Sequence, residues 1–62
     1  MKEKERALRM LEIMIERIKD ASTDEVRERR LYRAAGAIFI LYFIDVITYE
    51  EQRELEDRIF KV

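Results

Sequence analysis

The sequence predicts an all-α protein in which a long antiparallel helical hairpin is followed by a short third helix, within a single domain of residues 1–62. Three observations predict this fold class. The chain has no proline and one glycine, its hydrophobic residues recur at helical spacing, and a serine or threonine followed by glutamate marks two helix starts. We expect helices at about 3–20, 24–44 and 49–60.

The first helix carries one hydrophobic seam. Leu8, Leu11, Ile15 and Ile18 follow a 3-4-3 spacing, which places them along one side of an α-helix, like the a and d positions of a heptad. The next seam positions are polar or charged, so the pattern stops near residue 21. We therefore expect an amphipathic helix with one buried side and one solvated side.

A short turn separates the first two helices. In the run Ser22-Thr23-Asp24-Glu25, Ser22 can cap the second helix while the Glu25 carboxylate bonds back to it, or Thr23 can be the cap instead. Because the connection is so short, the two helices should pack antiparallel.

The second helix has two halves of opposite character. Residues 27–33 are basic and amphipathic, whereas residues 34–44 contain no charge and are apolar on every side of a helix. A small surface helix cannot bury such a segment by itself. Gly36 costs about 1 kcal/mol relative to alanine inside a helix, and close approach by another helix would explain its presence. We expect a second copy or another protein to cover part of this segment.

The apolar segment forms two stripes. Tyr32, Phe39 and Phe43 make an aromatic stripe, and an aliphatic stripe lies on a different side. We expect Phe39 and Phe43 to close the hairpin against the seam of the first helix. The pattern leaves open which stripe meets a partner chain. The residues expected in the interface of an intermolecular helical bundle, with a homodimer favoured, are Ala34, Ala37, Ile38, Ile40, Leu41 and Ile44.

A corner and a third helix complete the chain. Asp45 suits the left-handed backbone conformation that often ends a helix. Thr48, with Glu51 three residues later, predicts a capping box at the start of the third helix. The inward side of that helix is expected to carry Leu55 and Ile59, with Phe60 and Val62 as further candidates.

Composition narrows the classes of function. Thirteen basic and fourteen acidic residues give a net charge of −1, which argues against a general nucleic-acid binder and against a nucleic-acid mimic. Without cysteine or histidine, disulfides and a structural zinc site are excluded, and association is the remaining way to stabilise so small a domain.

The same features set expectations for location. The charged N-terminal segment lacks the apolar stretch of a signal peptide, and the absence of cysteine suits a reducing compartment, so we expect a cytoplasmic protein. The apolar run of residues 34–44 would rise about 16 Å as a helix, whereas a membrane span needs about 20 apolar residues. We therefore expect no membrane association.

The one local concentration of charge is formed by Arg27, Arg29, Arg30 and Arg33. These side chains could contact phosphate groups or an acidic protein partner. The interpretation we favour is that they lie over the hairpin and pair with nearby glutamates. No set of residues predicts catalysis, a metal site or a cofactor, since no histidine complements the carboxylate pairs and no base accompanies the hydroxyl groups.

The run from Leu41 to Leu55, which contains Ile47-Thr48-Tyr49-Glu50-Glu51, resembles the carboxyl end of short helical proteins of phages and mobile elements of Gram-positive bacteria. Those proteins often show an aliphatic-Ile-Thr-x-Glu-Glu corner, commonly with glycine where Asp45 stands here. The resemblance covers about a quarter of the chain and implies a regulatory or host-interaction accessory. It supplies no functional residues.

Together these features predict a small homo-oligomeric module that works through protein–protein interaction and also binds another protein. The alternative is a dimeric, nucleic-acid-associated regulator that uses residues 27–33, although we do not expect nucleic acid as the main partner. We do not expect an enzyme, because the chain offers no constellation of polar groups for catalysis.

Overall fold

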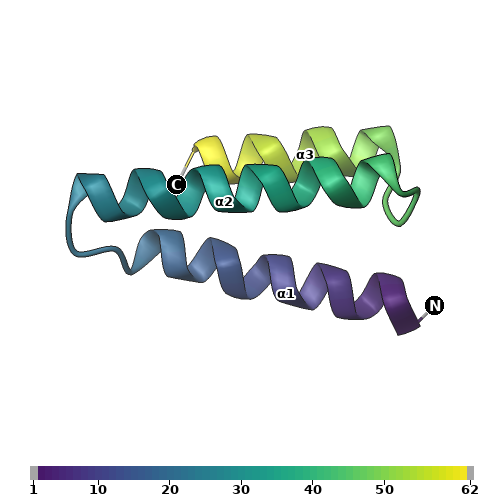
Figure 1. Ribbon diagram of the computed structural model, residues 1–62, viewed down its shortest axis with the longest axis horizontal. Coiled ribbons are helices and arrows are strands. Elements are labelled where there is room, and N and C mark those ends of the chain that lie inside the picture. Colours follow the sequence, from purple (N-terminus) through teal and green to yellow (C-terminus); the bar gives the residue numbers. More distant parts are fainter. Residues whose placement is uncertain (1, 62) are drawn as a thin grey trace.

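The computed structural model describes residues 2–61 and shows an all-α fold in this part of the chain. α1 spans Lys2–Lys19, α2 spans Asp24–Phe43 and α3 spans Tyr49–Phe60. The three-helix prediction is confirmed, and every helix end lies within one residue of its expected position. The helices run up, down and up, so α2 is antiparallel to both α1 and α3 (Figure 1).

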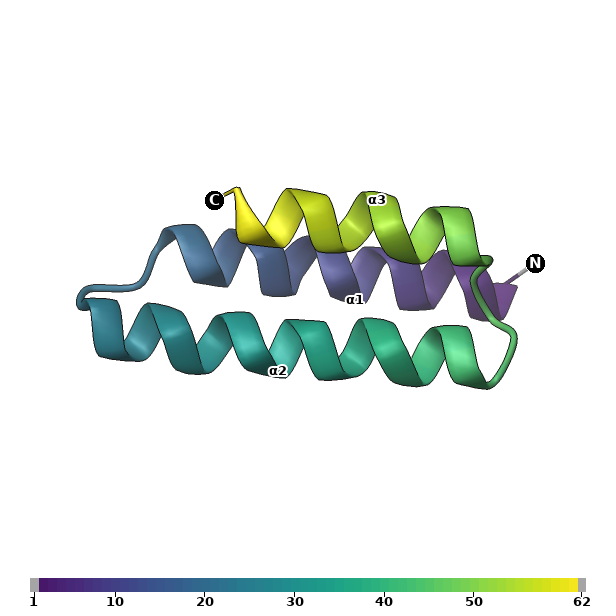
Figure 2. The ribbon, with the colours of Figure 1, turned by 90° about the horizontal axis from the view of Figure 1, so that it is seen from above.

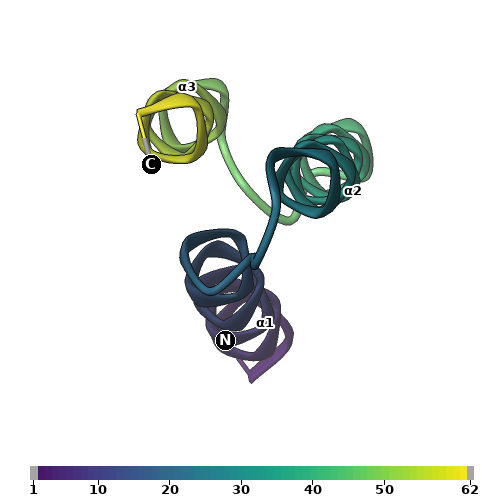
Figure 3. The same ribbon diagram turned by 90° about the vertical axis from the view of Figure 1, so that its left-hand side faces the viewer.

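α2 is the central element of the fold. Seen end-on, the three helices occupy the corners of a triangle (Figure 3), and α2 packs against both α1 and α3. α1 and α3 run in the same direction (Figure 2) and make far fewer contacts with each other. Each helix therefore packs mainly against the helix next to it in the sequence.

The core is aliphatic. Leu11, Ile15 and Ile18 of α1 are buried, which confirms the predicted seam, and Leu8 packs at its edge. No aromatic ring belongs to the buried set within residues 2–61. The remaining buried side chains are Ala34, Ile38, Ile47, Leu55 and Ile59.

The inward side of α3 is narrower than predicted. Leu55 and Ile59 are buried as expected, but Phe60 lies on the surface with more than half of its area exposed, so the suggestion that it points inward is wrong. Phe60 follows Ile59 by one residue, which rotates it about 100° away from the core. Val62, the other candidate, lies outside the described residues.

α2 is capped by Thr23. Its backbone is extended, with φ −138° and ψ 160°, and its Oγ1 accepts a hydrogen bond from the Val26 N–H at 3.2 Å. Of the two alternatives, Thr23 is confirmed and Ser22 is wrong. The reason is that the last turn of α1 continues through Ala21, whose N–H donates to the Ile18 carbonyl, so Ser22 stays within the turn.

α2 ends in a left-handed residue, as predicted. Asp45 has φ 63°, the one positive φ at a non-glycine position among residues 2–61. The Asp45 N–H donates to the Tyr42 carbonyl at 3.0 Å, and the Val46 N–H donates to the Leu41 carbonyl at 2.9 Å. These two bonds form a Schellman motif, which satisfies carbonyls that a helix end would otherwise leave unpaired.

The corner then passes directly into α3. Thr48 Oγ1 accepts a hydrogen bond from the Glu51 N–H at 3.1 Å, and the Glu51 carboxylate accepts one from the Thr48 N–H at 2.8 Å. This confirms the predicted capping box. Ile47, between the two motifs, is buried in the core and fixes the direction in which the chain turns.

Candidate association surface

The side of α2 that points away from the core is apolar. Ile38 is fully buried, whereas residues on the opposite side of the helix remain accessible. Phe43 is 74% exposed although it is aromatic. We call this surface the outer face of α2. It consists of Tyr32, Gly36, Phe39, Ile40, Phe43 and Ile44.

The aromatic stripe lies on the outer face and does not close the hairpin. Phe39 is 56% exposed, and its ring stacks on that of Phe43 with centroids 6.2 Å apart. The expectation that these two rings pack against α1 is therefore wrong. At about 100° per residue, Phe39 and Phe43 are rotated by roughly 100° and 140° from Ile38, which takes them outside a core built on that residue.

The residues expected in an oligomer interface fall into three groups. Ala34 and Ile38 are completely buried by the chain's own helices, so they offer no surface to a second chain, and their placement in a shared interface is corrected to the core of one chain. Ala37 and Leu41 are half-buried at the edge of this core. Only Ile40 and Ile44 belong to the outer face.

Gly36 lies in the middle of the outer face and has no neighbour there. A Cβ atom added at this position would meet no atom within 4 Å. Packing within the chain therefore does not require glycine, although glycine lowers helix stability by about 1 kcal/mol relative to alanine. The outer face therefore has open space above Gly36, which we call the gap at Gly36.

The predicted arginine cluster is only partly brought together. Arg30 donates from Nη1 to the Arg17 carbonyl at 2.7 Å, in the last turn of α1. Arg30 and Arg33 line a cavity of about 300 Å³ together with Met14 and Arg17. Arg29 is exposed on α2 away from this cavity, whereas Arg27 is half-buried.

The predicted pairing of these arginines with glutamates is wrong. Within residues 2–61, no ion pair joins any of the four to a carboxylate. Arg17, which completes the cavity, is not part of the predicted cluster, because it lies on the other helix of the hairpin. Its position in the last turn of α1, opposite the start of α2 in an antiparallel hairpin, is the signal that could have identified it.

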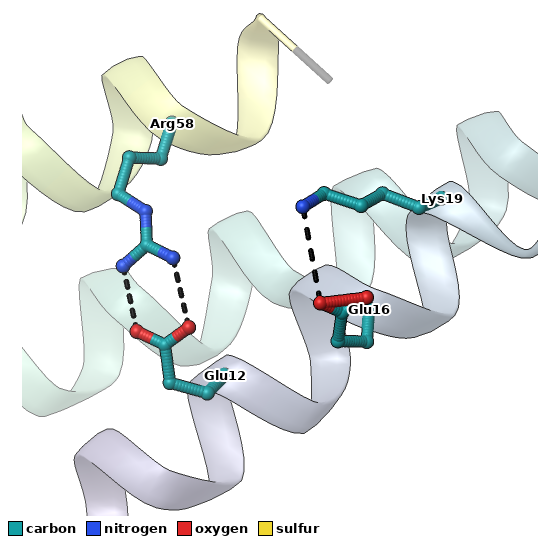
Figure 4. A network of polar contacts seen from close by, with 4 residues as sticks. All are labelled: Glu12, Glu16, Lys19 and Arg58. Carbon is teal, nitrogen blue, oxygen red and sulfur yellow. Dashed lines mark hydrogen bonds and ion pairs between the residues drawn. The ribbon is translucent and has the colours of Figure 1, made fainter.

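Ion pairs join α1 to α3 at the surface of the fold. Arg58 binds both carboxylate oxygens of Glu12, at 2.7 and 2.8 Å (Figure 4). Glu16, one turn further along α1, pairs separately with Lys19 at 3.8 Å. Lys4 lies 2.8 Å from Glu51, the same residue that forms the capping box. Two ion pairs therefore bridge α1 and α3 at the surface, beside the core that both helices share.

These contacts shift the pKa of two carboxyl groups. The hydrogen bonds from Arg58, followed by its charge, hold the pKa of Glu12 below its ordinary value of 4.5. The hydrogen bond from Lys4, followed by the one from the Thr48 N–H, lowers the pKa of Glu51 as well. Both groups bind a proton more weakly in the folded chain than in the unfolded chain.

We expect the folded chain to lose stability as the pH falls below about 4.5. At pH values between the lowered pKa values and 4.5, the unfolded chain binds more protons at Glu12 and Glu51 than the folded chain does, so acid favours unfolding. Above pH 4.5 both carboxylates are charged in either state, and their full contribution to the stability of the fold is present. Because both pairs are accessible to solvent, the effect is small and decreases with added salt. Thermal melts followed by circular dichroism from neutral pH down to about pH 3 measure it.

Glu12→Gln provides the control for this pH dependence. The variant keeps the shape of the side chain and removes one of the two shifted groups, so its melting temperature should fall less steeply with acid than that of the original chain. An identical acid response in both proteins would contradict the assignment of this dependence to Glu12.

Residues 2–61 provide neither a metal site nor a membrane-spanning helix. No group of three or more Asp and Glu side chains is arranged to hold a metal ion in this part of the chain. None of its helices combines the length and the apolar character needed to cross a membrane.

No protein-family model, curated protein or solved structure matches this chain. Its class is accordingly defined by its own geometry: an all-α, three-helix protein whose central helix is buried on one side and apolar on the other.

Proposed function

We propose that this protein is a small homo-oligomeric module that works through protein–protein interaction, and that the outer face of α2 is the surface through which two copies associate. The observation that supports the proposal is the exposure of Phe39, Ile40, Phe43 and Ile44, each more than half accessible, on one side of one helix. Clustered exposure of this kind is typical of an interaction site, whereas isolated exposed apolar residues are not.

The exposed area is of the size that a dimer needs. With about 200 Å² for an aromatic side chain and somewhat less for isoleucine, the five large side chains of the outer face expose on the order of 600 Å². This is at the upper end of the largest apolar patch on a typical monomer, roughly 300–600 Å². Complete burial of this face in two copies would remove about 1,200 Å² from water, the lower limit for stable interfaces.

A second copy is a natural partner for this surface. The outer face carries no carboxylate or amino group among its defining residues, and its ends are flanked by Arg29 and Arg33 on one side and by Asp45 on the other. We further propose that the assembled module binds another protein as a regulator or inhibitor in the cytoplasm, in keeping with the resemblance to short accessory proteins of phages and mobile elements.

Sedimentation equilibrium of the original chain and two variants tests self-association. We expect a mass of two chains for the original protein and a mass of one chain for Ile40→Glu, because a charge placed in the interface must be desolvated. Ile13→Glu is the matched control, since Ile13 on α1 is exposed to the same degree, 57% against 58%, but lies outside the outer face. This control should remain a dimer.

Circular dichroism accompanies the mass measurement, because the proposal requires Ile40→Glu to stay helical. A one-chain mass for the original protein at millimolar concentration would refute self-association. Loss of the dimer in Ile13→Glu, with the dimer retained in Ile40→Glu, would move the interface away from α2.

A second candidate function is supported by the arginine-lined cavity. Arg17, Arg30 and Arg33 line it, and none of them pairs with a carboxylate among residues 2–61. Arg30 donates to the Arg17 carbonyl, but the guanidinium groups of Arg17 and Arg33 can bind a phosphate. In a dimer, two such cavities could contact one nucleic acid. Binding to a labelled duplex or single strand that weakens steeply with salt would support this candidate, whereas no binding at low salt would refute it.

A further inference from the structure

We propose that two copies of this chain pair through α2 in antiparallel orientation, with the Phe43 ring of each copy seated in the gap at Gly36 of the other. This inference rests on the proposed self-association and adds the orientation and the register of the two helices. It starts from Gly36, for which packing within one chain gives no reason.

Phe43 and Gly36 are suited to each other in position and shape. They are separated by seven residues, two turns of helix, and differ by only about 20° in direction around the axis. The most exposed large hydrophobic side chain of the outer face and its one residue without a side chain therefore lie almost in line. A projecting ring and an open gap on one surface form a self-complementary pair, which is what a two-fold symmetric interface requires.

An antiparallel arrangement uses both features at once. When Phe43 of one copy is level with Gly36 of the other, Gly36 of the first is also level with Phe43 of the second, so the contact occurs twice. The two-fold axis then passes between Phe39 and Ile40, and these two residues oppose each other across the interface. A parallel arrangement would place Gly36 opposite Gly36 and leave the gap unfilled.

The charges at the ends of α2 favour the same orientation. Arg29 lies on the same side of α2 as the outer face, and Arg33, which also lines the cavity against α1, lies at the edge of this face. Neither forms an ion pair with a carboxylate among residues 2–61. In a parallel pair, each arginine would lie close to the same arginine of the other chain, and like charges oppose association. In the antiparallel register, Arg33 is level with the turn at Asp45 of the other copy, where the charge is opposite.

Pulsed electron spin resonance measures the orientation directly. The chain contains no cysteine, so Glu28→Cys carries a single spin label at an exposed position beside the outer face. In the proposed register, residue 28 is level with residue 51 of the other copy, which separates the two labelled positions by about 35 Å at a rise of 1.5 Å per residue. In a parallel dimer the helix axes are only about 8–10 Å apart at this level, and the label distance would fall below about 20 Å.

Exchanging the large and the small side chain between residues 43 and 36 tests the contact between Phe43 and Gly36. Gly36→Leu fills the gap and should weaken dimerisation at least tenfold, and Phe43→Ala should weaken it because the ring is lost. The double variant places a large side chain at residue 36 and a small one at residue 43, so the same contact is restored with its sides reversed. We expect the double variant to dimerise more tightly than either single variant. Glu28→Leu, beside the face, is the control and should leave the affinity within about twofold.

The outcomes separate this inference from the proposed function. A dimer with a label distance below about 20 Å, or a dimer that Gly36→Leu leaves intact, overturns the antiparallel register while self-association stands. A chain that remains monomeric at millimolar concentration overturns both. Because a Cβ at residue 36 meets no atom within 4 Å, Gly36→Leu should fold normally, and its circular dichroism shows whether it does.

Discussion

Replacing Ile38 by alanine should leave the chain largely unfolded at room temperature. Ile38 lies in the C-terminal half of α2 and is completely buried in the core that α2 forms with α1 and α3. Truncation of such a residue costs about 2–5 kcal/mol, because the apolar contacts are lost and a cavity remains. A domain of this size has a total stability of roughly 3–5 kcal/mol, so the loss is comparable with the whole.

Ile40→Ala is the matched control for Ile38→Ala. The substitution is the same and lies on the same helix two residues later, but Ile40 is 58% exposed. In dilute protein, where association does not contribute, urea unfolding should show a change within about 0.5 kcal/mol for Ile40→Ala. Similar losses of stability in the two variants would mean that the assignment of inner and outer sides of α2 is wrong.

Replacing Ile59 by alanine should release α3 from the rest of the fold. α3 contributes two buried side chains to the core, Leu55 and Ile59, and of these Ile59 has no accessible area. We expect a loss of about 2–5 kcal/mol in the free energy of unfolding. Isolated helices of twelve residues are marginal in water, so α3 should lose its helical structure when it is no longer docked.

Hydrogen exchange measured residue by residue tests this second prediction. Amides of α3 should exchange much faster in Ile59→Ala than amides at the centre of α1. Phe60→Ala removes a larger side chain from the next position, but Phe60 is 57% exposed, so its exchange pattern should match that of the original chain. Equal effects of the two substitutions would contradict the docking of α3 through Ile59.

The helices and their ends were predictable because they depend on local chemistry. The seam of α1, the threonine cap of α3 and the left-handed Asp45 each follow from residues close together in the sequence. Only the choice between Ser22 and Thr23 was left open. The choice depends on how far the chain keeps winding after Lys19, and a single hydrogen bond, from the Ala21 N–H to the Ile18 carbonyl, decides it.

The inward side of α2 was not predictable in the same way. From residue 34 to residue 44 every direction around the helix is apolar, so hydrophobic periodicity gives no contrast between the core and the surface. Packing of three helices decides the matter. Ala34 and Ile38 allow α1 and α3 to approach closely, whereas the rings of Phe39 and Phe43 would hold the helices further apart.

The polar contacts were also beyond prediction from sequence spacing. The Glu12 contact with Arg58 joins residues 46 positions apart, and the Arg30 contact with the Arg17 carbonyl joins residues 13 positions apart. Such pairs depend on the relative height of the helices, which the lengths of the two turns and the packing of the core set together. Local patterns could identify the arginines as a group but not the atoms they contact.

The central place of α2 also bears on how fast the chain reaches its native state. Each helix packs mainly against its neighbour in sequence, across turns of only a few residues, so little chain entropy is lost before stabilising contacts form. Proteins with such short-range topology fold within microseconds to milliseconds. The α1–α2 pair can form while α3 is still emerging from the ribosome, so the nascent chain would spend little time in states prone to aggregation.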